Sequence, residues 1–317
     1  MYIRNFHNNI INRFLFDSSD ISSNEDIRRK ILKILKDREK IKNRRTIIMK
    51  KKLIISSLLT GVLALGLIGC GSKSVDDKNI KIGVSPVPHK EIIENIVPQL
   101  EKEGYKVEIV EFNDYVLPNE ALESGEIDAN YFQHIAYLNE TNESKGLDLT
   151  YTAAIHLEPI ALYAKEFKKI EEIADGATIG IPNDPSNEAR ALNLLEAQGL
   201  IKLKDGELVT TRDITENTKN LKFKEVEAAQ LPRILEEVDA AIINGNYAIE
   251  AGLNPSSDAL LIEDKDAKAA EIYRNILAVK KGNEKIEKIE ALTKALTSEE
   301  TKKFIEEKYN GAVIPTF

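Results

Sequence analysis

The segment 179–200, IGIPNDPSNEARALNLLEAQGL, carries the residue best suited to binding a small anion. Asp184 is a favourable N-cap and Pro185 suits the first helical position, so a helix is predicted to begin here. Arg190 then lies about one and a half turns into the helix, near an N-terminus whose dipole favours anions. Because a guanidinium can bind a carboxylate through two parallel hydrogen bonds, Arg190 is a candidate for binding a ligand carboxylate. An Arg–Asp pair within the loop is the structural alternative.

Arginine is rare in the part of the chain that follows residue 69. Residues 70–317 carry 29 basic side chains, of which 25 are lysine. In such a lysine-rich sequence, a retained arginine points to a position that needs the planar guanidinium fork. The four arginines are Arg190, Arg212, Arg233 and Arg274. Of these, Arg190 has the best context for a site.

Three histidines lie in residues 70–317, and imidazole is a common ligand of zinc and related ions. His89, His134 and His156 are separated by 45 and 22 residues, and no His-rich loop joins them. Each is therefore interpreted as a polar cleft residue or a helix cap, and we expect no metal site. Capture of a metal ion by histidines that converge in space stays an alternative.

Known catalytic motifs are missing from the sequence. It contains no GxSxG elbow, Walker loop, GxGxxG, HExxH or paired-cysteine motif. Hydrolysis by paired carboxylates stays open, although most acidic residues lie in charged runs that are typical of solvated helices. We therefore expect a protein that is not an enzyme and needs no cofactor. A secreted carboxylate-dependent hydrolase and a structural surface adhesin are the rival functions.

Charge is unevenly distributed along the 317 residues, which have a formal net charge of −8. Residues 1–52 have 15 basic and 6 acidic side chains, residues 53–69 have none, and residues 70–317 have 29 basic and 46 acidic ones. An acidic surface repels the phosphates of DNA and RNA. No nucleic-acid partner is therefore expected.

A secretory signal precedes the acidic part. Three lysines at 50–52 are followed by LIISSLLTGVLALGLIG, seventeen uncharged residues that end before Cys70, the only cysteine. A basic region, an apolar region and small residues in this order are typical of a signal peptide, and residues 67–71 resemble the bacterial lipobox. We interpret 49–69 as a lipoprotein signal peptide and Cys70 as the lipidated residue, because a run of 17 residues is short for a membrane span.

The residues around this signal have simpler interpretations. Met49 is its natural start, so 1–48 are interpreted as a mis-start extension, disordered or forming a basic helix. A cytosolic pre-region is the alternative for 1–48. Residues 70–79 are predicted to be a polar tether.

From residue 80 onward, short apolar strands alternate with amphipathic helices. This alternation predicts an α/β architecture with mainly parallel sheets. The predicted strands span 80–84, 106–111, 127–130, 152–155, 159–164, 178–181, 222–227, 238–243 and 275–280. The predicted helices span 91–103, 132–142, 188–198, 231–238 and 286–296.

Two lobes are favoured over one large domain. The segments GEIDANYFQ and EVDAAIING share a short pattern, and the strand NILAVK near the C-terminus returns toward the first part of the chain. We expect lobe 1 over 80–160 plus 272–317 and lobe 2 over 161–271. Open α/β sheets bind ligands beyond the carboxyl ends of their strands, so the ligand is expected in a cleft between the lobes.

Several motifs together resemble the NlpA lipoprotein family, the substrate-binding lipoproteins of bacterial methionine ABC importers. They follow the lipobox in the order IKIGVSPVPHKEI, ESGEIDANYFQHIAYL, HLEPIALYAKEFK, IPNDPSNEARALNLLEAQGLI, VDAAIINGNYAIEAGL and IYRNILAVK. The resemblance runs from Lys50 to Phe317. It is specific because of the conjunction of these motifs, and any one of them alone would be weak.

The resemblance implies a two-lobed, type II periplasmic-binding-protein-like fold that closes on a free amino acid. It implies an arginine for the ligand carboxylate, asparagines for its polar backbone groups, and a wall around its side chain formed by aromatic and histidine residues. The position of His156 varies within the family, so its role is the weakest of the set. The ligand-binding residues implied are Arg190, Asn244, Asn275, Tyr131, Phe132, His134 and His156.

The same resemblance implies a ligand and partners. The ligand is L-methionine, with D-methionine or a methionine-containing dipeptide as neighbouring specificities, and the partners are the permease and ATPase subunits of an importer. Lipid on Cys70 would hold the protein at the membrane, facing the extracellular or periplasmic side. A binding lipoprotein for another small amino acid or for a metal ion is the alternative.

Overall fold

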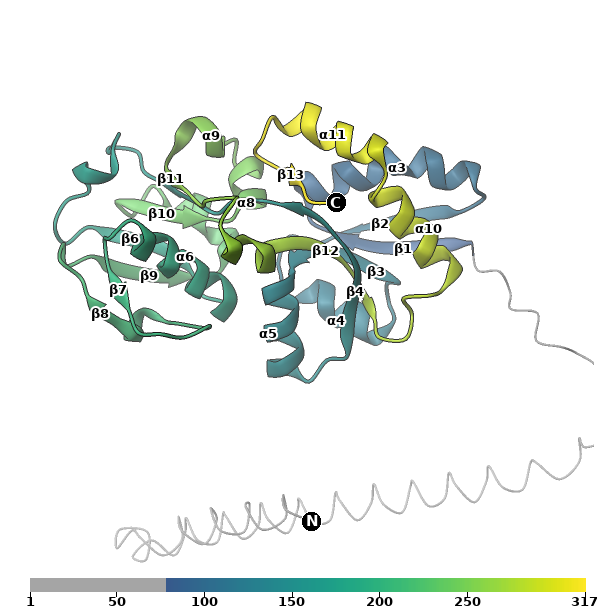
Figure 1. Cartoon of the computed structure of the whole chain (residues 1–317), viewed down its shortest axis with the longest axis horizontal. Coiled ribbons are helices and arrows are strands. Elements are labelled where there is room, and N and C mark those ends of the chain that lie inside the picture. The colour runs from purple at the N-terminus through teal and green to yellow at the C-terminus, as the bar shows by residue number, and fades with distance from the viewer. Residues whose placement is uncertain (1–77) are drawn as a thin grey trace, which may run out of the picture. The chain divides into compact units, whose positions relative to one another are not determined.

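The computed structural model describes residues 78–317 (Figure 1). The predicted extension 1–48, the signal peptide 49–69, Cys70 and most of the tether lie outside these residues. Within residues 78–317, no helix combines the length and apolar character needed to cross a membrane.

A six-stranded sheet is built from the two ends of the described chain. Its strand order is β13-β4-β12-β3-β1-β2. β1 runs parallel to β2 and β3, whereas β12 is antiparallel to β3 and β4, and β13 is antiparallel to β4. The strands are β1 (Asn79–Val84), β2 (Lys106–Glu111), β3 (Ala129–His134), β4 (Leu149–Leu157), β12 (Arg274–Lys280) and β13 (Ile314–Pro315).

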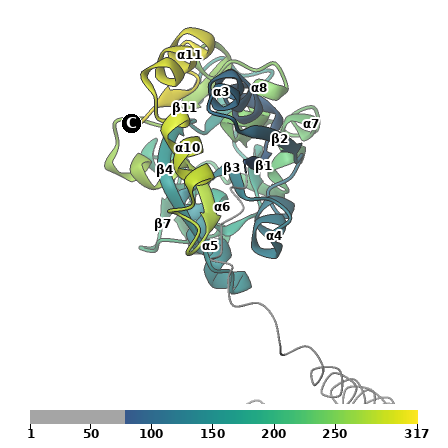
Figure 2. The ribbon, with the colours of Figure 1, turned by 90° about the vertical axis from the view of Figure 1, so that its right-hand side faces the viewer.

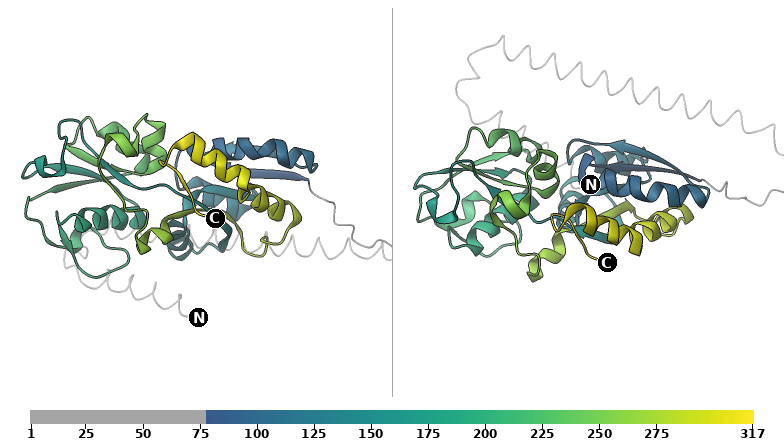
Figure 3. Two further views of the ribbon diagram at one scale, coloured as in Figure 1. Left: turned by 45° about the horizontal axis from the view of Figure 1, so that its top comes forward. Right: turned by 90° about the horizontal axis from the view of Figure 1, so that it is seen from above.

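Helices cover both faces of this sheet. One core cluster joins it to α3, α10 and α11, and another joins it to α4 and α5. Figure 2 shows α3 and α11 on the side away from α4 and α5, and Figure 3 shows the C-terminal helices beside the N-terminal strands. The helices are α3 (Glu91–Lys102), α4 (Leu117–Ser124), α5 (Ile135–Lys145), α10 (Glu287–Leu296) and α11 (Glu299–Tyr309).

A five-stranded sheet is formed by the middle of the chain, in the order β11-β5-β10-β6-β9. β6 is parallel to β9 and β10, while β5 is antiparallel to β10 and β11. Helix α6 packs on one face, and α7 and α8 pack on the other. These elements are β5 (Ala161–Tyr163), β6 (Thr178–Pro182), α6 (Pro185–Ala197), β9 (Lys222–Val226), α7 (Leu231–Ile234), β10 (Ala240–Ile243), α8 (Gly245–Glu250) and β11 (Ala259–Ile262).

Three short elements complete the middle part of the chain. The strands β7 (Lys202–Leu203) and β8 (Ile214–Glu216) pair with each other as a separate antiparallel hairpin. Helix α9 (Pro255–Asp258) directly precedes β11. None of the three was among the predicted elements.

The expectation of mainly parallel sheets is wrong, because both sheets are mixed. Strands joined by a helix are parallel, as predicted for strand–helix–strand units. The chain crosses between the sheets twice, from β4 to β5 and from β11 to β12, and no α-helix lies at either crossing. These four strands pair antiparallel to their neighbours. The predicted return of the late strand to the first sheet is confirmed by the pairing of β12 with β3 and β4.

Two predicted helix boundaries are also wrong. The helix expected at 231–238 is the shorter α7, which ends at Ile234. The helix expected at 132–142 begins later, because residues 129–134 form the fully buried strand β3 and α5 starts at Ile135. A run of buried apolar and aromatic residues does not by its periodicity separate a strand from a helix. The lobe boundaries 80–160 plus 272–317 and 161–271 stay a prediction, and we retain them as a proposal.

Candidate functional site

A pocket is lined by residues from both parts of the fold, those that carry the six-stranded and the five-stranded sheet. Its lining combines aromatic rings, amides and one guanidinium. The lining residues are Tyr115, Phe132, Gln133, His134, Tyr137, Glu158, Asn187, Arg190, Asn244, Gly245, Asn246 and Asn275.

Arg190 is buried in the second turn of α6 and donates hydrogen bonds to two residues, Glu263 and Glu158. Its Nε donates to Glu263 Oε1 at 2.9 Å, and its Nη2 donates to Glu263 Oε2 at 2.5 Å and to the Glu158 carbonyl at 2.8 Å. The Tyr273 ring centroid lies 4.3 Å from Cζ. Burial disfavours the charged guanidinium, but the Glu263 carboxylate outweighs this and raises the pKa of Arg190. Among the described residues no acceptor is bonded to Nη1, so this nitrogen is the donor left for a ligand.

The helix that carries Arg190 begins as the sequence predicted. The Asp184 side chain accepts from the Asn187 backbone N–H at 3.0 Å, and Pro185 occupies the first turn. The alternative pairing of Arg190 with an aspartate of the loop does not form, because Glu263, which follows β11, takes that place.

Three aromatic rings form one wall of the pocket. The ring centroids of Tyr115, Phe132 and Tyr137 lie 5.8–6.0 Å from one another, which is within the range of attractive aromatic pairs. The Tyr115 hydroxyl donates to Asn246 Oδ1 at 2.5 Å, and the Tyr137 hydroxyl donates to the Tyr115 carbonyl at 2.8 Å. These bonds hold the rings in place.

His134 is the last residue of β3 and caps α5, as expected for one of the histidines. Its Nδ1 accepts from the Tyr137 backbone N–H at 3.1 Å, so Nε2 carries the proton and donates to Asn187 Oδ1 at 3.1 Å. Burial and the neighbouring Arg190 guanidinium lower the pKa of His134 to about 3. The imidazole is therefore neutral at pH 7.

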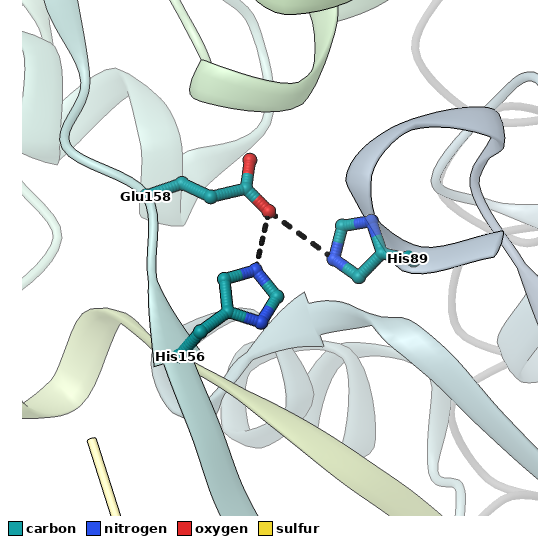
Figure 4. Close-up of side chains that lie close together, drawn as sticks. All are labelled: His89, His156 and Glu158. Carbon is teal, nitrogen blue, oxygen red and sulfur yellow. Dashed lines mark hydrogen bonds and ion pairs between the residues drawn. The ribbon is translucent and has the colours of Figure 1, made fainter. Parts of the chain in front are cut away.

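Behind the pocket, His89 and His156 both point toward the Glu158 carboxylate (Figure 4). His156 Nδ1 accepts from the Tyr131 hydroxyl, so its Nε2 donates to Glu158 Oε1 at 2.7 Å. His89 Nε2 donates to Asn275 Oδ1 at 3.0 Å and lies 3.3 Å from Glu158 Oε1. Because Asn275 accepts through its oxygen, its amide nitrogen is the atom left for a ligand.

Burial sets the protonation of this cluster. It lowers the pKa of His89 to about 4 and that of His156 to about 3. It raises the pKa of Glu158, although His89, Arg190 and the Asn246 backbone N–H act in the opposite direction. Both imidazoles are therefore neutral at pH 7, and each has one N–H to donate.

His89, His156 and Glu158 also make up a possible set of metal ligands, since their ligand atoms lie within 4.8 Å of one another. Zinc bonds of 2.0–2.1 Å place tetrahedral ligand atoms about 3.3 Å apart. The distance of 2.7 Å between His156 Nε2 and Glu158 Oε1 is shorter and is that of a hydrogen bond. The cluster is therefore explained by hydrogen bonds, and the expectation that no metal is bound stays a prediction.

The structure brings five of the seven expected ligand-binding residues into the pocket lining, namely Phe132, His134, Arg190, Asn244 and Asn275. Tyr131 and His156 are fully buried but outside the lining. Adjacent residues of a strand point to opposite faces, so Phe132 and Tyr131 cannot both face the pocket. Whether each of the seven binds the ligand stays a prediction.

Sequence reasoning missed several lining residues. Tyr115 lies in a loop, and Tyr137 and Asn187 lie in first helical turns. Asn246 is in the first turn of α8, two residues after the predicted Asn244. The one signal available was that Tyr137 and Asn187 each lie three residues after a helix cap, where the chain enters a helix at the end of a strand.

These features define the class of protein: a two-lobed, periplasmic-binding-protein-like α/β fold with a small polar and aromatic pocket between two sheets. The chain belongs to the NlpA lipoprotein family, whose model matches residues 80–317.

Two similar proteins are methionine-binding lipoproteins by name. The chain is 41% identical over 275 residues to the methionine-binding lipoprotein MetQ of Bacillus subtilis, covering 84% of this chain and 98% of that one. It is 41% identical over 257 residues to the D-methionine-binding lipoprotein MetQ of Salmonella typhi, covering 79% and 93%. A solved nutrient-binding protein from Burkholderia cenocepacia bound to methionine has a TM-score of 0.72 and 42% identity, covering 75% of this chain and all of that one.

Proposed function

We propose that this protein captures free methionine in its pocket and delivers it to the permease of an ABC importer. The observation that carries the proposal is the pocket itself, which combines a guanidinium donor, amide groups and a three-ring wall. Relatives named for methionine binding and a related structure that holds methionine support the same ligand.

The chemistry of the lining suggests how the zwitterion binds. The α-carboxylate is expected at Arg190 Nη1 and the Asn275 amide nitrogen, because among the described residues no acceptor is bonded to either donor. The ammonium is expected near Asn244 Oδ1 and the Glu158 carboxylate. The thioether is polarizable and packs well against aromatic edges, so the wall of Tyr115, Phe132 and Tyr137 suits the side chain. No bond is made or broken, and the ligand favours the closed arrangement by its differential affinity.

The substitution Arg190→Ala tests this placement by isothermal titration calorimetry with L-methionine. We expect affinity to fall by about 100-fold or more, since charge-assisted hydrogen bonds contribute about 1.5–3 kcal/mol each. Arg233→Ala, an exposed arginine of α7, is the matched control and should bind as the wild type does. Unchanged affinity in Arg190→Ala would contradict the pairing of the ligand carboxylate with Arg190.

The identity of the ligand is tested by native mass spectrometry of the purified protein, followed by titration with L-methionine, D-methionine and a glycyl-methionine dipeptide. A bound mass of one amino acid supports the proposal. A bound metal ion would support the alternative of metal capture. Failure to bind any amino acid, together with turnover of a screened ester or glycoside, would support a hydrolase.

We further propose that lipid on Cys70 anchors the protein at the outer side of the cell membrane, close to its importer. At least two acyl chains are needed for stable anchoring, and confinement raises the effective concentration at the permease. Cys70→Ala is expected to abolish incorporation of radiolabelled palmitate and to release the protein into the soluble fraction, with methionine affinity unchanged. Labelling that persists in this variant would contradict the assignment.

A further inference from the structure

Asn244 has a buried amide oxygen that no described residue contacts by a hydrogen bond. This residue follows β10, lines the pocket and is 4% exposed. A buried acceptor without a partner is costly and rare in folded proteins. The oxygen is therefore a place where a ligand donor is expected.

The orientation of this amide decides what the pocket recognises, because a rotation by 180° would replace the acceptor by two donors. Asn244 is held in one orientation by its nitrogen, which donates to Asn187 Oδ1 at 2.7 Å. The orientation of the Asn187 amide therefore decides the orientation of the Asn244 amide.

Hydrogen bonds at both the nitrogen and the oxygen of the Asn187 amide fix its orientation. Its nitrogen donates to both carboxylate oxygens of Asp184, at 2.9 and 3.1 Å, and a carboxylate can only accept. Its oxygen accepts from His134 Nε2 at 3.1 Å, and His134 Nδ1 is already used by the Tyr137 backbone N–H. Reversing Asn187 would set its oxygen against the Asp184 carboxylate, acceptor against acceptor, and its nitrogen against the His134 Nε2–H, donor against donor.

Resting on the proposed function, we propose that Asp184 is a positioning residue. It acts through Asn187 to hold the Asn244 oxygen toward the pocket, and this acceptor makes the pocket selective for ligands with a protonated α-amine. An ammonium donates where the oxygen accepts, whereas an analogue without the amine leaves the buried oxygen unpaired. Sites built to hydrogen-bond a polar group discriminate strongly against ligands that lack it.

The test is the substitution Asp184→Asn, measured with L-methionine and with its des-amino analogue 4-(methylthio)butanoate by calorimetry and ligand-observed NMR. Asparagine is as good an N-cap as aspartate, so its oxygen keeps the cap, but its nitrogen opposes that of Asn187. We expect L-methionine to bind about 10- to 100-fold more weakly and the analogue to change by less than about threefold. An equal loss for both ligands, or no loss for either, would overturn the proposal.

Two further variants separate the relay from other effects. Asn187→Ala cuts the relay while keeping the Asp184 carboxylate, and the same selective loss is expected even if Asp184→Asn does not fold. Asp114→Asn is the matched control, because Asp114 also accepts from backbone N–H groups at a helix start and lines, together with Asp184, a second pocket. Asp114→Asn should leave the ratio of the affinities for L-methionine and the des-amino analogue unchanged. If this ratio shifts as it does in Asp184→Asn, the loss of charge alone explains the effect and the proposal is overturned.

A measurement without ligand distinguishes the relay from the proposed function. Nitrogen NMR of the ligand-free protein should show His134 protonated at Nε2, as the relay requires. Protonation at Nδ1 would overturn the relay. A wild-type protein that binds no amino acid would instead overturn the proposed function, together with the selectivity that rests on it.

Discussion

Arg190 shows how much of a site depends on partners that are distant in sequence. The sequence predicted that Arg190 binds a ligand carboxylate through two parallel hydrogen bonds. In the structure, the Nε and Nη2 atoms of the guanidinium instead donate to Glu263, 73 residues away. A ligand carboxylate is left with Nη1. The residue type and its helix were predictable from the cap and the spacing, whereas its pairing depends on where the segment after β11 lies.

The orientation of the Asn244 and Asn275 amides also depends on residues that are distant in sequence. The family resemblance implied that Asn244 and Asn275 both bind the polar backbone groups of the ligand. In the structure Asn275 uses its oxygen for His89, so of these two amides only that of Asn244 has an oxygen without a hydrogen bond to a described residue. The neighbours that decide this come from other elements and leave no local signature in the sequence.

Buried neutral His134 makes stability depend on pH. Its pKa falls from 6.5 to about 3 on folding, so between these values the unfolded chain binds the additional proton. Stability contributed by the neutral ring is complete above pH 6.5 and is lost as the pH falls toward 3, at up to about 1.4 kcal/mol per pH unit.

We expect His134→Asn to reduce this pH dependence, because asparagine keeps the helix cap but does not titrate. Urea unfolding of both proteins at pH 6.5 and 4.5 is the measurement. The wild type should lose about 1–2 kcal/mol more than the variant over this interval. The comparison cancels the opposite contributions of Glu158 and Asp184, whose pKa values are raised by burial. Equal losses would mean that His134 titrates normally.

At the scale of elements, helix α8 begins where two parts of the chain approach closely. A Cβ built on Gly245, its first residue, would lie 2.7 Å from Glu158 Cβ and 3.0 Å from Glu158 Oε2. Real side chains do not approach so closely, so glycine is required for β10 to deliver Asn244 beside Glu158. The close contact joins a wall of the pocket to the first chain crossing between the sheets.

Gly245→Ala is therefore expected to lower the free energy of unfolding by about 1–3 kcal/mol through overpacking, and to weaken methionine binding by at least about tenfold because Glu158 is displaced. Chemical denaturation and calorimetry measure the two effects. In Gly206→Ala, the added Cβ meets one methyl of Val209 at 3.2 Å on an exposed loop, and both quantities should stay near the wild-type values. Wild-type affinity in Gly245→Ala would show that Glu158 tolerates displacement.

Most elements were predictable because their apolar periodicity is strong. All nine predicted strands have counterparts in the structure, and Asp184 and Pro185 marked the start of α6 correctly. The start of α5 was not predictable, since the run before it is buried on all sides as part of β3. Helix α4 was missed because its cap Val116 and its first residue Leu117 are exposed, so its start shows no amphipathic pattern.

At the scale of the whole molecule, side chains bridge the two sheets around the pocket. Tyr115 and Asn113, which follow β2, are bonded to Asn246 and Tyr247 of α8, at 2.5 and 3.4 Å respectively. His134 and Asn187 form a third bridge. We call these the closure contacts, because separating the sheets would break all of them. The sequence predicted the cleft but could not supply these pairs.

Tyr115→Phe removes one closure contact and keeps the aromatic wall. Losing a hydrogen bond worth about 1 kcal/mol should shift the ligand-free protein toward open arrangements and weaken methionine binding by roughly fivefold. Small-angle X-ray scattering should then give a larger radius of gyration without ligand and the wild-type value at saturation. Tyr151→Phe, on an exposed part of β4, is the control, and identical scattering of both variants would exclude a role of the contact in closure.

The strand order of the six-stranded sheet implies an order of assembly. β12 lies between β4 and β3, yet it is synthesised after every strand of the five-stranded sheet. As the chain emerges from its N-terminal end, the five-stranded sheet can complete its pairing while the six-stranded sheet still lacks its inner strand β12. Until residue 280 has emerged, β3 and β4 have unpaired backbone groups at facing edges, and such edges are prone to pair with other chains. The nascent protein is therefore most exposed to aggregation just before β12 is inserted.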